Sequence, residues 1–283
     1  MRPRSTRARQ FSNSAAKIIM VPAALIGIAV LVWILWEVIA RGVGALTPSF
    51  FTELPTPPGM EGGGLANAIV GTLIMTGVAT LIGTPIGLLA GVYLAEFGTT
   101  GRLATAVRFT TNLLMGTPSI IIGVFIYAVI VLRTGHFSGW AGAVALAVLM
   151  IPVVLRTTED MLNLVPDELR ESALALGAPR WRATIGVIFR AAKSGLVTGI
   201  LLAVARVSGE TAPLLFTALN SFYWPSSLGE PTANLTVTIY NYAMSPYPDW
   251  QQKAWGASLL ITVAVLFMAV MSRIGLRERK ART

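Results

Sequence analysis

The sequence predicts an all-α polytopic protein that crosses a lipid bilayer about six times. Of its 283 residues, 54% are hydrophobic and only 12% are charged, and the mean hydropathy is +0.68. A soluble domain carries roughly 25% charged residues, so this chain has too few charges to cover a surface that faces only water. Six apolar runs approach or exceed the about 20 residues that span the hydrocarbon core. The predicted spans are Ile18–Ala40, Leu65–Phe97, Phe109–Leu132, Trp140–Leu155, Gly195–Leu219 and Ala254–Ile274.

The first run follows a basic segment and therefore resembles a secretory signal. Its apolar part is longer than the roughly 7–15 residues of a signal core, and no clean small-residue cleavage site follows. The run is therefore interpreted as an uncleaved span. Glu37 and Arg41 lie four residues apart near its outer end, in the favourable order, and are expected to form a solvated ion pair.

The second run contains a glycine at every fourth position. Gly83, Gly87 and Gly91 are expected on one face of the helix, where they leave a flat surface. Small residues at this spacing allow two membrane helices to approach closely. We interpret these glycines as a packing surface rather than a ligand site.

The distribution of positive charge predicts the orientation. If the N-terminus is cytoplasmic, the cytoplasmic segments hold 18 of the 22 lysines and arginines. The outer segments then hold Arg41, Arg133 and Lys253, and Arg206 lies inside the fifth run. Because positive residues accumulate on the cytoplasmic side, both termini are predicted to be cytoplasmic. The same rule explains the net charge of +9 without a nucleic-acid partner.

The composition excludes several chemistries. The chain has no cysteine and one histidine, His136, so it offers neither thiolates nor an imidazole cluster for a metal. No stretch matches the GxxxxGK[ST] phosphate loop. We therefore expect no metal site, no cofactor and no catalytic residue in this chain, and any ATP is expected on a partner subunit.

The segment Arg156–Lys193 is long for a connection between spans, and its pattern predicts structure. Pro166, followed by two acidic residues, suits the first turn of a helix. Gly177 suits a left-handed stop. Between them lies an apolar stripe, and beyond them a second amphipathic stretch leads into the fifth run. The stripe comprises Leu169, Ala173 and Leu176, and the second stretch comprises Trp181, Ile185 and Ile188. Such an element is either an interfacial helix that lies on lipid or a docking element for a soluble partner.

The stretch Glu171–Ala178 resembles the cytoplasmic "EAA" loop of permease subunits in ATP-binding cassette importers. Glu171, Ala173 and Gly177 match that pattern at its spacing, and Ser172 replaces the first alanine. The later Leu-Pro of the pattern reads Phe189-Arg190 here. The resemblance implies that Glu171, Ser172, Ala173 and Gly177 couple the permease to an ATPase.

Most of residues 65–275 is similar to one branch of these importers, the A-type phosphate permeases. The segments that carry the similarity are Asn67–Glu96, Gly116–Gly123, Arg156–Leu162, Arg206–Leu215 and Ile239–Gln252. The resemblance implies a type I importer fold in the bacterial cytoplasmic (inner) membrane. It also implies four kinds of partner: a homologous second permease, two ATPase subunits, an extracytoplasmic phosphate-binding protein and inorganic phosphate.

The expected organisation follows from the spans and the resemblance. A basic cytoplasmic tail occupies 1–17, and the first transmembrane helix with an outer loop occupies 18–64. The permease core occupies 65–275 and contains the coupling loop 156–193. A second basic tail occupies 276–283.

Arg206 and Glu210 lie inside the fifth run, where charges are costly and usually face a cavity or the bundle interior. Their i, i+4 spacing permits a structural ion pair. Alternatively, both line the substrate pathway, because a guanidinium fork fits phosphate oxygens and a carboxylate favours an oxyanion that still carries a proton. Other possibilities for the whole chain are a permease for another oxyanion or nutrient, an ion-coupled carrier and a membrane-embedded enzyme. The single histidine argues against an enzyme, and the predicted docking helix argues against an ion-coupled carrier.

Overall fold

The computed structural model describes the backbone of residues 6–98 and 101–280, and the side chains of residues 17–98 and 101–272. Within these residues the regular secondary structure is helical, and one isolated antiparallel bridge joins Pro55 and Gly63. The longer helices are α1 (Thr6–Gly42), α3 (Ala66–Val92), α4 (Arg102–Gly116), α5 (Ser119–Ile126), α7 (Gly139–Asn163), α8 (Asp167–Ala175), α10 (Phe189–Ser208), α12 (Leu235–Ala243) and α13 (Pro248–Lys280). The short ones are η1 (Val43–Ala45), α2 (Pro48–Thr52), η2 (Tyr93–Phe97), η3 (Tyr127–Val131), α6 (Leu132–Thr134), α9 (Arg180–Ala183), η4 (Thr184–Ile188) and α11 (Ala212–Leu215).

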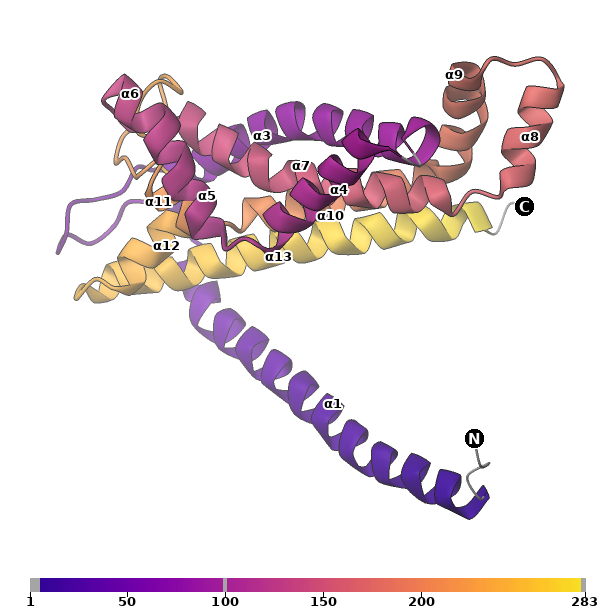
Figure 1. The fold of residues 1–283 in the computed structure, drawn as a ribbon. Coiled ribbons are helices and arrows are strands. Elements are labelled where there is room, and N and C mark those ends of the chain that lie inside the picture. The colour runs from indigo at the N-terminus through magenta and orange to yellow at the C-terminus, as the bar shows by residue number, and fades with distance from the viewer. Residues whose placement is uncertain (1–5, 99–100, 281–283) are drawn as a thin grey trace.

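The prediction of about six membrane spans is confirmed. Five continuous helical stretches are long and apolar enough to cross a bilayer, and a sixth span results if one bent pair of helices is counted as one. The five are Lys17–Ala45, Ala66–Phe97, Gly139–Asn163, Arg180–Ser208 and Pro248–Ser272. The helices α3, α7, α10 and α13 run side by side along the molecule (Figure 1).

The helices α3 and α7 pack closely along their length, and glycines make this possible. A methyl group on Gly83 would lie 3.2 Å from the Cβ of Met150, and one on Gly87 would lie 2.8 Å from the Cβ of Val154. Gly91 faces the backbone of α7, because a methyl group there would lie 2.7 Å from the carbonyl oxygen of Leu155. These three glycines are the face of α3 on which α7 packs.

The helix α7 is approached in the same way from α10. A methyl group on Gly195 would overlap the Sδ of Met161, and one on Gly199 would overlap the Cγ2 of Thr157. The α7 backbone therefore lies between two glycine-lined surfaces. This second surface has the same i, i+4 spacing as the first.

The third predicted span, Phe109–Leu132, is not one continuous helix. Its residues belong to α4 and to the helical stretch Ser119–Thr134, which meet at an angle of 105°. The bend lies at Gly116-Thr117-Pro118, where Thr117 is extended with ψ 131°. A proline disfavours the helical conformation of the residue before it, and hydropathy alone does not register that restriction.

The fourth span and the loop after it have different boundaries from those predicted. The helix α7 continues past Leu155 to Asn163, because its charged residues form ion pairs there. The helical stretch of the fifth span begins early, at Arg180. The connection that lies outside both spans is therefore 164–179 rather than 156–193.

The prediction of a fifth span over Gly195–Leu219 is also wrong at its outer end. The helix stops at Ser208, and Gly209 is its C-cap. Irregular backbone and the short helix α11 follow, and the chain then enters α12, which the hydropathy pattern did not indicate. Asn234 caps α12 by accepting a hydrogen bond from Val237 N at 2.8 Å.

The helix α1 projects away from the other helices (Figure 1). Its C-terminal end packs on α13, where a methyl group on Gly42 would lie 2.8 Å from the Cβ of Leu259. None of the residues in the most apolar part of its span is buried against the rest of the chain. The predicted pair of Glu37 and Arg41 is confirmed, with Oε2 and Nε 2.7 Å apart. The start of α1 and the end of α13 lie toward the same end of the molecule as α8 (Figure 1).

Candidate coupling and translocation sites

The predicted helix in the connection between α7 and α10 is present as α8. Pro166 is its N-cap, and Asp167 and Glu168 fill the first turn, where carboxylates suit the helix dipole. Gly177 has a φ of +81°, which favours glycine. The amide of Gly177 donates to Leu174 O at 2.9 Å, and the amide of Ala178 donates to Ala173 O at 3.2 Å. This pair of bonds is a Schellman motif and ends the helix.

The helix α8 presents its polar residues outward. Glu171 and Ser172 are exposed, whereas Ala173 is 8% exposed and faces the protein. Leu176, which the sequence placed on the apolar stripe with Ala173, is 88% exposed. The exposed side chains of α8 and its C-cap therefore include the carboxylates of Glu168 and Glu171, the hydroxyl of Ser172 and the apolar side chain of Leu176.

A single side chain, Arg170, fastens α8 to the membrane-spanning helices. Its Nε and Nη2 donate to Glu96 Oε1 at 3.1 and 3.0 Å. Its Nη1 donates to Val165 O at 2.7 Å and to Asp167 Oδ1 at 2.8 Å, and its Nη2 also donates to Leu162 O at 2.6 Å. These partners lie on η2 at the end of α3, in and just after the last turn of α7, and at the start of α8. One guanidinium therefore joins three segments.

The electrostatics around Arg170 favour its charged form. Burial alone lowers the pKa of this guanidinium, but the hydrogen bonds and charges of Glu96 and Asp167 outweigh it, so the pKa is raised above its ordinary value. Glu96 is itself well shielded, with 9% of its side chain exposed. The pair is a charge-assisted, forked contact of the kind that fixes geometry.

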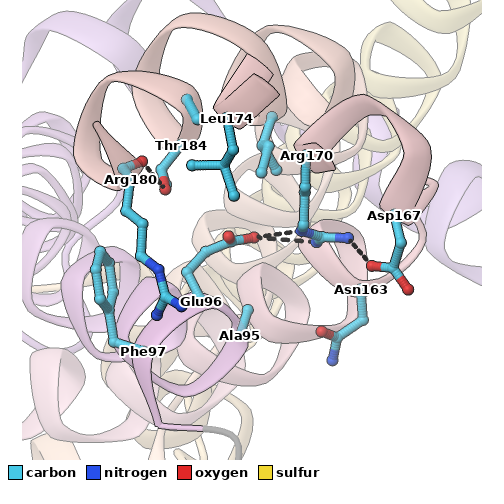
Figure 2. A pocket seen from close by; sticks show the side chains of 11 residues that line it. Ala95, Glu96, Phe97, Asn163, Asp167, Arg170, Leu174, Arg180 and Thr184 are labelled. Atoms are coloured by element: carbon cyan, nitrogen blue, oxygen red, sulfur yellow. Dashed lines mark hydrogen bonds and ion pairs between the residues drawn. The ribbon is translucent and has the colours of Figure 1, made fainter. Parts of the chain in front are cut away.

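A polar cavity of about 470 Å³ lies beside this contact. Figure 2 shows Glu96 and Arg170 facing each other in it, with Leu174 pointing inward and the side chain of Arg180 extending from α9 toward Phe97. The cavity lies between the end of α3, the helix α8 and the start of the fifth span. Beside the cavity α8 contacts α9 and η4, and on its other side it is held through Arg170.

A second ionic contact joins α4 to α7. Arg108 Nε is 2.7 Å from Glu159 Oε1, and its Nη2 donates to Leu94 O of η2 at 3.2 Å. Glu159 is 4% exposed, and its other oxygen lies 3.6 Å from Arg156 Nη1. A buried carboxylate needs such partners, because leaving it unpaired is costly.

The structure places Arg206 and Glu210 differently from the prediction. Arg206 lies in the last turn of α10, and Glu210 follows the helix end, so the two do not share a helical face. Neither forms an ion pair with any other residue that the structure describes. Gly209 ends the helix between them, which removes the i, i+4 geometry. The backbone oxygen of Glu210 accepts a hydrogen bond from Thr236 Oγ1 at 2.7 Å.

Arg206 is exposed at one end of a groove of about 720 Å³ between α7 and α10. Thr157 and Thr198 line the same groove. Their hydroxyls donate to backbone carbonyls of their own helices, at 2.8 and 2.9 Å. No side-chain hydrogen bond or ion pair of Arg206 is found among the residues that the structure describes, so its guanidinium can donate to a ligand at this groove. A cation also suits the C-terminal end of a helix.

Sequence reasoning missed the two ionic contacts, although all four residues were visible. Arg108 and Arg170 were interpreted only as topological charges, and Glu96 was interpreted as the end of an apolar run. Glu96 and Arg170 are 74 positions apart, and Arg108 and Glu159 are 51 apart. The available signal was an acidic residue at the end of each of two spans, because an ionisable residue in an apolar run usually has a partner.

The comparisons with known proteins agree with this arrangement. The family described as "Binding-protein-dependent transport system inner membrane component" matches residues 83–277. The "Phosphate transport system permease protein PstA" of Yersinia pestis is 47% identical over 272 residues, which are 96% of this chain and 92% of that protein. The protein of the same name from Haemophilus influenzae is 51% identical and covers 91% of each chain. The chain belongs to this family of phosphate transport system permeases.

Solved structures support the fold of this permease. A bacterial ABC transporter that imports the polysaccharide alginate matches with a TM-score of 0.62, covering 94% of this chain and 98% of that one at 16% identity. The inward-facing MetNI methionine ABC transporter matches with a TM-score of 0.62, covering 75% of this chain and 95% of that one at 23% identity. At these identities the likeness concerns the fold of the permease and not its substrate.

Proposed function

We propose that this chain is the permease subunit of an ATP-driven phosphate importer in the bacterial cytoplasmic membrane. The observation that carries the proposal is the identity of 47–51% over more than nine-tenths of the chain with permeases named for phosphate transport. The chain supplies part of the translocation pathway. ATP is hydrolysed on a partner subunit and not on this chain.

The proposed assembly contains this chain, a homologous second permease, two ATP-binding cassette ATPase subunits and an extracytoplasmic phosphate-binding protein. Both termini of the permease are cytoplasmic in this arrangement. The charge distribution supports that orientation, since 18 of 22 basic residues then lie inside. The position of α8 at the same end as the start of α1 and the end of α13 supports it as well (Figure 1).

The coupling element is α8. Glu171 and Ser172 are exposed on its outer face, Ala173 packs inward, and Gly177 ends the helix. A short helix with a fixed end, held by a guanidinium to two spans, is suited to enter a cleft on an ATPase subunit. It moves with the spans to which it is joined.

The substrate contact on this chain is Arg206, with Glu210 beside the end of the same helix. Arg206 is exposed at the groove and unpaired among the described residues. A planar guanidinium binds two phosphate oxygens at once. The carboxylate of Glu210 accepts hydrogen bonds only, so it favours an oxyanion that carries a proton, which phosphate does near neutral pH.

Transport by the reconstituted complex tests this function. Two permeases and two ATPase subunits are placed in proteoliposomes with the binding protein outside and ATP inside, and entry of radiolabelled phosphate is measured. Uptake that needs ATP and resists excess sulfate is expected. If the complex takes up labelled sulfate and not labelled phosphate, another oxyanion is the substrate. If phosphate enters without the ATPase subunits, the chain is an ion-coupled carrier.

A further inference from the structure

We infer that Arg170 is a positioning residue for coupling, which fastens α8 to the π-helical end of α3 so that the docking helix and the transmembrane helix move together. The inference rests on the proposed docking of α8 to an ATPase. It assigns a role to a residue that stands outside the coupling residues Glu171, Ser172, Ala173 and Gly177.

The contacts of Arg170 are unusually complete for a residue in a connection between spans. It donates five hydrogen bonds to four partners, and two of these bonds converge on the carboxylate of Glu96. Only 19% of its side chain is exposed. A solvated arginine on a docking face needs none of these contacts, so the side chain serves the inside of the subunit rather than the partner.

Arg170 binds η2, the π-helical turn at the end of α3. In η2 the chain leaves α-helical geometry, and Gly98 N donates to Tyr93 O at 2.6 Å across five residues. A π-helical turn at the end of a helix often marks a functional site. Arg108 binds η2 through Leu94 O and continues to Glu159 of α7. The carboxylate of Glu96 and the carbonyl of Leu94 therefore link η2 to α8 and to α4.

A displacement of α8 can be transmitted through η2 to α3 and α7. The backbone of α3 at Gly83, Gly87 and Gly91 packs directly on side chains of α7, so a shift of one helix displaces the other. A close-packed interior transmits such displacement instead of absorbing it. The helix α8 also contacts α9 and η4 at the start of the fifth span, beside the cavity of about 470 Å³. Arg170 provides the hydrogen-bonded route from α8 to the ends of α3 and α7.

The inference is tested with Arg170→Ala in the complete complex. Two cysteines are introduced into this naturally cysteine-free chain and spin-labelled: Glu168→Cys, at an exposed position of α8 outside the coupling residues, and Leu89→Cys on the exposed face of α3. The distance distribution between the labels reports the fastening directly and does not depend on any ATPase contact. We expect Arg170→Ala to broaden that distribution. Phosphate uptake is expected to fall roughly 10–100-fold, the factor that corresponds to a lost charged hydrogen bond, while ATP hydrolysis continues.

Two further variants keep the test decisive if Arg170→Ala lowers membrane abundance. Arg170→Lys keeps the charge but loses the fork, and Glu96→Gln keeps the shape but loses the charge, so both should broaden the distribution to a smaller extent. Arg182→Ala is the matched control, because the one contact found for that exposed arginine is with its neighbour Trp181. The control should retain a narrow distribution and normal uptake.

The outcomes separate this inference from the docking proposal. An unchanged distance distribution in all three variants overturns the fastening, and a broadened distribution with normal uptake overturns its role in coupling. Docking is judged separately, by cross-linking of Ser172→Cys to a cysteine in the ATPase cleft. If that cross-link is absent from the otherwise native protein, the docking proposal is wrong even when the distance distribution supports the fastening.

Discussion

Gly91 of α3 and Thr158 of α7 approach so closely that a methyl group on Gly91 would lie 2.6 Å from the Cβ of Thr158. The contact is between a helix backbone and a β-branched side chain, which cannot turn away because its χ1 angle is restricted. The separation of the two helices is therefore set at this point by the absence of a side chain on α3.

This contact predicts the effect of one added methyl group. Gly91→Ala should destabilise the subunit by about 1–3 kcal/mol, the cost typical of overpacking. Gly77→Ala is the control on the same helix, because no atom lies within 4 Å of the position that its methyl group would take. It should be neutral or stabilising by up to about 1 kcal/mol, since alanine favours helix more than glycine does. Thermal unfolding of the purified complex in detergent measures both, and equal melting temperatures for the two variants would contradict the packing role.

The orientation of the chain predicts where its ends and outer loop lie. A reporter fused after Thr283 should give a cytoplasmic signal, and a reporter inserted within Thr47–Gly64 should give an external one. The physical reason is the accumulation of basic residues on the cytoplasmic side. The opposite signal at either site would contradict the topology.

The stop at Gly177 predicts a variant that uncouples transport. Gly177→Val places a β-branched residue at a φ of +81°, at a cost of about 1–2 kcal/mol. No atom lies within 4 Å of the added Cβ position, so the strain is in the backbone and should unwind the end of α8. Phosphate uptake should fall while membrane abundance and ATP hydrolysis persist.

Gly186→Val is the control for that experiment. Gly186 also has open space around its Cβ position, but its φ is not positive. It should retain uptake. If Gly177→Val transports at the normal rate, the shape of the helix end is not needed for docking.

The exposed guanidinium at the end of α10 predicts a geometry-dependent effect. Arg206→Lys keeps the charge but loses the two-pronged donor, so uptake should fall roughly 10–100-fold at normal abundance. Arg190→Lys, at an exposed position near the start of the same helix, should have no effect.

The double variant Arg206→Gln with Glu210→Gln decides between pathway and structure. Since the structure has no ion pair between the two residues, each single change and the double change should leave membrane abundance unaltered. The double variant should not transport phosphate. Normal uptake by this protein would eliminate the pathway role of both residues.

Much of the fold could be predicted because its signals are local. The apolar runs gave α1, α3 and α13, and the sequence from Pro166 to Gly177 gave α8 with both of its ends. The breaks in the third and fifth spans lie inside apolar sequence, where the hydropathy is unchanged. Gly116-Thr117-Pro118 and Gly209 carried the missing information, since glycine and proline alter backbone preference without altering hydrophobicity.

The exposed residues of the candidate coupling site could be predicted from the sequence, but its ionic contacts could not. The outward residues of α8 follow from helical spacing, which is a property of adjacent positions. The partners of Arg170 and Glu159 come from distant parts of the chain and are brought together by tertiary structure. Charge counts predict on which side of the membrane these residues lie but cannot pair them. Arg206 was expected in the middle of a helix and lies at its end because Gly209 ends the helix within the apolar run.

The glycine face of α3 also has a consequence for how the protein is made. Its partner α7 begins at Gly139, so α4 and α5 must leave the ribosome before α7 can cover that face. During this interval α3 resides in the membrane with bare backbone at Gly83, Gly87 and Gly91, a surface on which any small-residue helix can pack. A chain that stops short of α7 therefore exposes a glycine surface that the complete subunit buries.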